Sequence, residues 1–112
     1  MDDESYFPEK SIPDLELSVE NRRSISRLTP TDVARIDNWL MSFAIRRGRK
    51  VSYLAMQSMS QLESDLPDVP DAFYILRVQK LIEEKRLIVS LGEIEDWPGC
   101  EVCLPKGEIE WK

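Results

Sequence analysis

The sequence contains no histidine, only two cysteines and only four glycines, and each shortage argues against a class of functional site. Histidine is the commonest general base and metal ligand, so its absence disfavours most acid–base enzymes and zinc sites. Four scattered glycines do not form the glycine-rich loop that cradles a phosphate. No apolar run approaches the roughly 18 residues needed to span a bilayer. We therefore expect a protein that is not an enzyme, uses no cofactor or metal and does not cross a membrane.

The two cysteines, Cys100 and Cys103, have the spacing of half a zinc or redox motif. No second pair completes a tetrahedral site, and positions three apart on a strand point to opposite faces of the sheet. We interpret them as ordinary strand residues. Two cysteines in a chain of this length fit a reducing compartment, and the acidic Met-Asp-Asp-Glu start is unlike a secretory signal. Together they predict a cytoplasmic protein.

Charge is distributed in blocks along the 112 residues, whose formal net charge is −6. Residues 1–20 contain seven acids and one lysine, whereas residues 21–50 contain eight basic residues and two acids. Acids again outnumber bases in the rest of the chain. The overall negative charge argues against tight general nucleic-acid binding, which depends on cations that displace phosphate counterions. A basic turn is still a candidate phosphate contact, and it consists of Arg46, Arg47, Arg49 and Lys50.

Capping residues and apolar periodicity predict three helices followed by a β-hairpin. Thr29 suits an N-cap and Pro30 the first helical position, and apolar residues then recur at intervals of three and four. The expected helices are residues 29–45, a second helix from Val51 that ends before the turn at residues 67–70, and residues 70–86. The expected strands are residues 87–91 and 100–104, joined by a loop over residues 92–99. This order is that of a winged helix. We predict an α+β, three-helix winged-helix-like domain over residues 29–105, closed by a C-terminal β-hairpin.

The two ends of the chain have weaker patterns. Residues 1–28 contain isolated apolar residues without a helical period, and they predict an acidic N-terminal arm that is at least partly extended. Alternation of polar and apolar residues over 14–19 also allows a short edge strand. Residues 106–112 are expected to form a short C-terminal tail.

The region from Leu28 to Pro105 resembles a small bacterial domain family of unknown function. Its members combine an LTPxDxxxID opening, a basic Lys-Val-(Ala/Ser) step, an (I/V)PDxFYxxRxxxL middle and an EVRLP close. The matching residues are Leu28-Thr29-Pro30, Asp32, Ile36-Asp37, Lys50-Val51-Ser52, Val69-Pro70-Asp71, Phe73-Tyr74, Arg77, Leu81, Leu87, Gly92-Glu93-Ile94 and Glu101-Val102-Cys103-Leu104-Pro105. This chain departs from the pattern at Gly48, where members often have tryptophan, and at Cys103, where they often have arginine. The resemblance implies a fold and no activity.

Arg77 is expected to lie in the middle of the third helix, close to its inner face. A buried guanidinium needs a carboxylate partner, because its desolvation is otherwise uncompensated. Asp37 or Asp71 can supply that carboxylate. We favour this structural ion pair over a ligand-binding role for Arg77.

Our first functional hypothesis is a protein-binding inhibitor of the immunity or antitoxin type, which neutralises a basic, nuclease-like bacterial toxin. Its acidic surface would mimic or mask phosphate, and tryptophans would anchor the partner. The expected partner-binding residues are Glu93, Glu95, Asp96, Trp97, Glu101 and Trp111. For Trp97, an equally good interpretation is a lid over the end of the hairpin. Under this hypothesis the basic turn pairs with the acidic arm inside the protein.

The alternative hypothesis is a winged-helix nucleic-acid-binding or regulatory domain. The third helix, with its four cations, would then lie near a groove and the basic turn would contact backbone phosphate. The acids of the 92–99 loop argue against this reading, because a nucleic-acid binder favours arginine or lysine there. A third interpretation is an oligomer-forming domain with no external target, which would show self-association alone.

Overall fold

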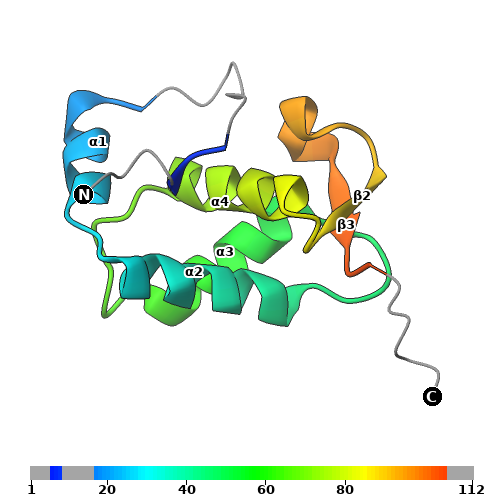
Figure 1. Cartoon of the computed structure of the whole chain (residues 1–112), viewed down its shortest axis with the longest axis horizontal. Coiled ribbons are helices and arrows are strands. Elements are labelled where there is room, and N and C mark those ends of the chain that lie inside the picture. The colour runs from blue at the N-terminus through cyan, green and yellow to red at the C-terminus, as the bar shows by residue number, and fades with distance from the viewer. Residues whose placement is uncertain (1–5, 9–16, 106–112) are drawn as a thin grey trace.

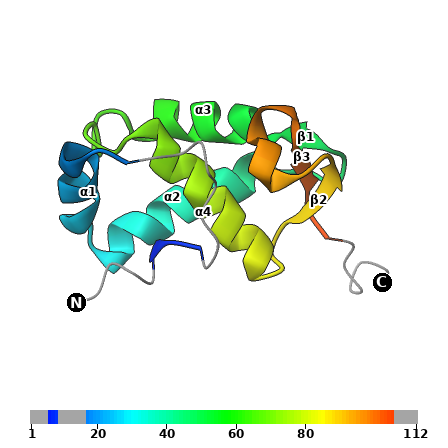
Figure 2. The same ribbon diagram turned by 90° about the horizontal axis from the view of Figure 1, so that it is seen from above.

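A computed structural model describes residues 6–8 and 17–105, and over these ranges the fold is α+β, with helices packed beside a small three-stranded antiparallel sheet (Figure 1). The elements are α1 (Val19–Ser26), α2 (Pro30–Phe43), β1 (Arg49–Lys50), α3 (Val51–Leu62), α4 (Asp71–Glu83), β2 (Ile88–Leu91), the 3₁₀ helix η2 (Ile94–Gly99) and β3 (Glu101–Cys103). The sheet lies at one end of the molecule and α1 at the other, with α2, α3 and α4 packed against one another between them (Figures 1 and 2). In the described part of the chain, no helix is both long and apolar enough to span a membrane.

The start of α2 follows directly from its sequence. The Thr29 hydroxyl accepts a hydrogen bond from the Asp32 N–H (3.1 Å), and the Asp32 carboxylate accepts one from the Thr29 N–H (3.0 Å). This reciprocal capping box satisfies two backbone donors that have no partner within the helix, and Pro30 at the first position needs none. The predicted helix start at Thr29-Pro30 is confirmed.

The second predicted helix is present as α3, which ends at Leu62, before the turn at residues 67–70, whereas the third helix ends earlier than predicted. α4 stops at Glu83 because Lys85 adopts a left-handed backbone conformation, with φ of 65°. The Arg86 N–H then bonds to the Leu81 carbonyl (2.9 Å) and the Lys85 N–H to the Ile82 carbonyl (2.9 Å). These two bonds form a Schellman motif, which closes the helix and turns the chain into β2.

The sheet has the strand order β1-β3-β2, with both pairings antiparallel. The predicted hairpin is present as β2 and β3, and the predicted loop between them contains η2. Sequence patterns missed β1, because its two residues, Arg49 and Lys50, are too few for alternation to be visible. β1 pairs Arg49 with Val102 and Lys50 with Glu101, which brings the basic turn to the sheet.

The N-terminal segment is in part a helix where an extended arm was expected. Residues 19–26 form α1, whose N-cap Ser18 accepts a hydrogen bond from the Asn21 N–H (3.0 Å). Only Ile25 of this helix is buried, so the short segment has no apolar period to reveal it. Of the segment 14–19, where a short edge strand was one possibility, only residues 17–19 are described, and they contain no strand. The rest of the expected arm and the tail at 106–112 lie outside the described residues, apart from residues 6–8.

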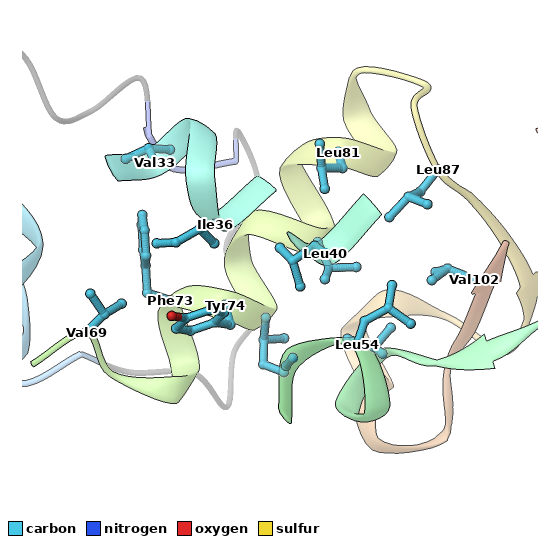
Figure 3. Close-up of a cluster of buried hydrophobic side chains, with 14 of the residues drawn as sticks. Val33, Ile36, Leu40, Leu54, Val69, Phe73, Tyr74, Leu81, Leu87 and Val102 are labelled. Atoms are coloured by element: carbon cyan, nitrogen blue, oxygen red, sulfur yellow. The ribbon is translucent and has the colours of Figure 1, made fainter. Parts of the chain in front are cut away.

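The core lies between the three central helices and the sheet (Figure 3). Side chains from α2 and α4 point toward one another, and Leu54 of α3 closes the layer from below (Figure 3). The largest fully buried side chains include Phe73, Tyr74, Leu40, Leu81 and Leu87. Each of these stabilises the fold by about 1.5–3 kcal/mol relative to an exposed position. α4 is therefore the central helix of the domain, since it has core on almost every side.

Candidate partner-binding surface

The acidic loop between β2 and β3 is held in a defined shape. Gly92 begins it with a positive φ of 79°, a conformation that glycine adopts without strain. The Asp96 N–H then donates to the Glu93 carbonyl (2.9 Å), and the Cys100 N–H donates to the Trp97 carbonyl (3.1 Å). These bonds form η2, which the sequence did not predict. As a result Glu93, Glu95 and Asp96 are all exposed on one short loop.

Trp97 follows these carboxylates and is half-buried. It packs against the core cluster and also lines a hollow of about 280 Å³ between α3, α4 and η2. Met56, Met59 and Ile75 form much of the wall of this hollow, and Asp71 lies at its rim. Trp97 therefore packs toward α3 and α4 and at the same time offers an aromatic surface beside the acids.

An exposed apolar surface along α3 was not predicted from the sequence. Met56 is 66% exposed and Tyr53 is 40% exposed, although both lie on a helix whose other face is in the core. Met56 borders the hollow under Trp97 and also two neighbouring hollows of about 540 Å³ and about 420 Å³. The sequence offered one indirect sign of this surface: Met56 is apolar but lies outside the apolar period that forms the buried face of α3. We call Tyr53, Met56, Met59 and Trp97 the methionine surface.

The basic turn at residues 46–50 lies at the sheet end of the molecule, far from α1 (Figure 1). The Arg49 guanidinium donates to the Phe43 carbonyl (2.8 Å) and lies over the Tyr53 ring, 5.0 Å from its centroid. Arg49 is therefore partly used in packing. Arg46, Arg47 and Lys50 are exposed, as a phosphate contact would require. No described acid of α1 approaches this turn, since the only acid in that helix, Glu20, lies at the other end.

Glu101 lies on β3, the central strand of the sheet, and not on the acidic loop itself. It lies opposite Lys50 in the sheet, and a Cβ atom placed on Gly48 would come within 2.6 Å of its Oε1. The same Cβ would be 2.5 Å from the Ser90 hydroxyl. The turn therefore passes close over the sheet at Gly48, and a larger residue there would displace the Ser90 and Glu101 side chains. Of the six residues expected to bind a partner, the structure groups four on η2 and its start, moves Glu101 away, and does not describe Trp111.

Arg77 is paired with Asp37 across the core. Its Nε donates to Oδ1 (2.9 Å) and its Nη2 to Oδ2 (2.7 Å), while Nη1 donates to the Tyr6 carbonyl (2.6 Å). Asp71, the other carboxylate considered, is exposed in the first turn of α4. The ion pair joins α4 to α2 and fixes the short described segment at Tyr6. Each of the three guanidinium nitrogens of Arg77 thus donates a hydrogen bond within the protein, as the expected structural ion pair requires.

No family model, curated protein or solved structure matches this chain. The resemblance drawn from the motifs between Leu28 and Pro105 therefore stays an expectation. Any functional conclusion has to come from the geometry of the molecule itself.

The two cysteines and the acids near them are the remaining candidates for a chemical site. Cys100 and Cys103 are free and buried. Burial raises the pKa of the Cys100 thiol, and the nearby carboxylates of Glu95, Glu101 and Asp96 raise it further. The thiolate, which is the reactive form, is therefore disfavoured at neutral pH. Within residues 6–8 and 17–105, no group of three or more histidine, cysteine or acidic side chains is arranged to hold a metal ion.

Proposed function

We propose that this chain is a non-catalytic protein-binding inhibitor of the immunity or antitoxin type, which neutralises a basic, nuclease-like bacterial toxin. The observation that carries the proposal is the exposed trio Glu93, Glu95 and Asp96 beside Trp97 and an apolar hollow. Protein interfaces combine an apolar centre with a polar rim, and tryptophan is enriched among the residues that dominate binding energy. The acidic loop and the methionine surface supply both parts side by side.

The two parts of the surface have different roles in this proposal. The carboxylates attract a basic partner over a distance of about one Debye length, about 8 Å at physiological salt, and speed the encounter. The methionine surface then receives an apolar side chain of the partner. Met56 and Met59 suit this role because an unbranched thioether adapts its shape to what it contacts. The seven acids in residues 1–20 add to the same overall charge.

The proposal also includes the fold, which we interpret as a winged-helix-like scaffold. The order α2, β1, α3, α4, β2, η2, β3 and the strand order β1-β3-β2 support it, and η2 then occupies the position of the wing. A wing with three acids and no cation is unsuited to phosphate and suited to a basic protein. The scaffold supplies a rigid base for the loop, and the loop determines the function.

The second candidate is nucleic-acid binding through the basic turn, favoured by the exposure of Arg46, Arg47 and Lys50. In helix-turn-helix proteins the second helix of the motif enters the major groove with exposed side chains. Here that helix is α4, whose residues from Phe73 to Gln79 are all buried. Within it, the Arg77 guanidinium is paired with the Asp37 carboxylate. Groove recognition by α4 is therefore disfavoured. The nucleic-acid candidate is then limited to contacts between the basic turn and backbone phosphate, and such contacts do not read the base sequence directly.

Capture from native host extract tests the first proposal. Three forms of the tagged chain are compared at low salt: wild type, Glu95→Lys/Asp96→Lys, and Glu20→Lys/Asp68→Lys as a control with the same change in net charge. Glu20 on α1 and Asp68 in the connection between α3 and α4 are exposed, and both of these segments lie at the end of the molecule opposite the sheet (Figure 1). We expect a basic protein to bind the wild type and the control and to be lost from the loop variant. Equal loss from both variants would mean that net charge alone is responsible, and would contradict a specific site on η2.

The nucleic-acid candidate has its own test in fluorescence anisotropy at low ionic strength. A labelled DNA or RNA duplex is titrated with the wild type and with Arg46→Glu/Arg47→Glu. Binding that weakens with salt and is lost in the variant would support phosphate contact by the basic turn. A flat titration with the wild type would end this candidate.

A further inference from the structure

β2 is an edge strand with an exposed apolar surface. The strand order β1-β3-β2 leaves one side of its backbone without a strand partner among the described residues. Ile88 is 42% exposed, Val89 is 37% exposed and Leu91 is 57% exposed. Edge strands are commonly protected by lysine or proline within the strand, but Ile88–Leu91 contains neither. Such an edge can accept another strand.

The register of β2 shows how its side chains are disposed. Ile88 lies opposite Cys103, Val89 opposite Val102, and Leu91 opposite Glu101, so Ser90 is an extra residue in a bulge. Cys103 and Glu101 are two positions apart and share one face of the sheet. Ile88 and Leu91 therefore also share a face, although three positions separate them. Without the bulge they would lie on opposite faces.

We propose that β2 pairs in antiparallel orientation with β2 of a second copy of this chain, about a two-fold axis that passes beside Val89. Since the bulge removes Ser90 from the ladder, Ile88, Val89 and Leu91 occupy three successive positions. An axis at the middle position places Val89 opposite Val89 of the second copy and Ile88 opposite Leu91 of the second copy. All the opposed side chains then lie on matching faces, as an antiparallel pair requires. The two small sheets become one continuous sheet.

The charges at the two ends of β2 fit the same pairing. Arg86 lies two residues before Ile88 and Glu93 two residues after Leu91, and both side chains are exposed. Antiparallel pairing about Val89 places Arg86 of one copy beside Glu93 of the other, at both ends of the interface. Among the described residues, Arg86 makes a long ion pair with Glu84 (3.9 Å), which leaves its guanidinium available for this contact. A parallel pairing would instead bring like charges together.

A four-residue strand buries less surface than the roughly 1,200 Å² or more of a stable complex, so we expect a weak dimer. Analytical ultracentrifugation of the pure full-length chain from about 10 μM to about 1 mM should show a monomer–dimer equilibrium. Arg86→Glu and Glu93→Arg should each shift it toward monomer by about tenfold or more, and the double variant should restore it. A single monomeric species at every concentration would overturn the proposal, and so would a dimer that neither single variant weakens.

The position of the axis has a separate test in disulfide formation. Directly opposed residues of an antiparallel pair have Cα atoms about 4.5–5.5 Å apart, within the range that a disulfide bridges. Val89→Cys should therefore form a covalent dimer under mild oxidation. Ile88→Cys should not, because Leu91 lies opposite, and neither should Val19→Cys on α1, which controls for random collision at a site that is 71% exposed. Equal crosslinking of all three would contradict the proposed axis. These readouts use the chain alone, so they are independent of any external partner.

Discussion

Replacing Arg77 by methionine should be among the most damaging single changes in the domain. The substitution leaves the Asp37 carboxylate, whose side chain is 10% exposed, and the Tyr6 carbonyl without the three hydrogen bonds that Arg77 provides. Breaking a buried ion pair in this way costs about 3–5 kcal/mol. Domains of this size are stable by about 5–15 kcal/mol, so Arg77→Met should lose a large share of its free energy of unfolding.

Urea unfolding followed by far-ultraviolet circular dichroism measures the loss, and the chain offers a matched control. Arg35 makes a similarly short ion pair with Asp65 (2.6 Å), but the two side chains are 42% and 56% exposed. Arg35→Met should therefore cost less than about 1 kcal/mol. The double variant Arg77→Met/Asp37→Leu removes both buried charges and should be more stable than Arg77→Met alone. Equal costs at positions 77 and 35, or no recovery in the double variant, would refute the reasoning.

Three further predictions concern single positions. Lys85→Gly should raise the free energy of unfolding by about 0.5–1 kcal/mol, because Lys85 has a φ of 65° that glycine adopts without strain; a decrease in urea unfolding would contradict this. Ser58→Ala should raise the free energy of unfolding by about 1 kcal/mol, since the buried Ser58 hydroxyl has no hydrogen-bond partner within the described residues. A lower Tm in calorimetry would contradict this prediction. Burial raises the pKa of Tyr74 to about 12. The protonated phenol therefore contributes its full share to the free energy of unfolding below about pH 10, where an unfolded tyrosine is also protonated. This stabilisation is lost as the pH rises toward 12. We expect a loss of about 2 kcal/mol over that interval in the wild type and a smaller loss in Tyr74→Phe, and identical pH profiles would be evidence against a buried phenol.

The helices were predictable because their signals are local. Thr29, Pro30 and Asp32 determine the start of α2 through bonds within four residues, and the period of α3 is unbroken from Val51 to Leu62. α1 gave no such signal, because a single buried residue, Ile25, attaches it to the core. β1 was equally invisible, since two residues form a strand only through their pairing with β3.

The residues of the candidate site could be predicted from the sequence, but their arrangement in space could be predicted only in part. The acids of residues 93–96 and Trp97 are adjacent in sequence, so their proximity on η2 followed from the chain itself. Glu101 is only four residues beyond Trp97, yet its pairing with Lys50 places it at the basic turn. The methionine surface depends on α3, α4 and η2 meeting in space, which no local pattern reports. Long-range packing therefore accounts for most of what the sequence did not reveal.

The most direct test of the proposed function is co-purification of the tagged chain from native host cells at low salt, with nuclease-treated and untreated extracts compared side by side. We predict a basic protein in stoichiometric amount in both samples, with a nuclease activity that the purified chain suppresses when it is added back. Nucleic acid alone, present in the untreated extract and absent after treatment, would contradict the inhibitor proposal and assign the exposed cations of the basic turn to phosphate.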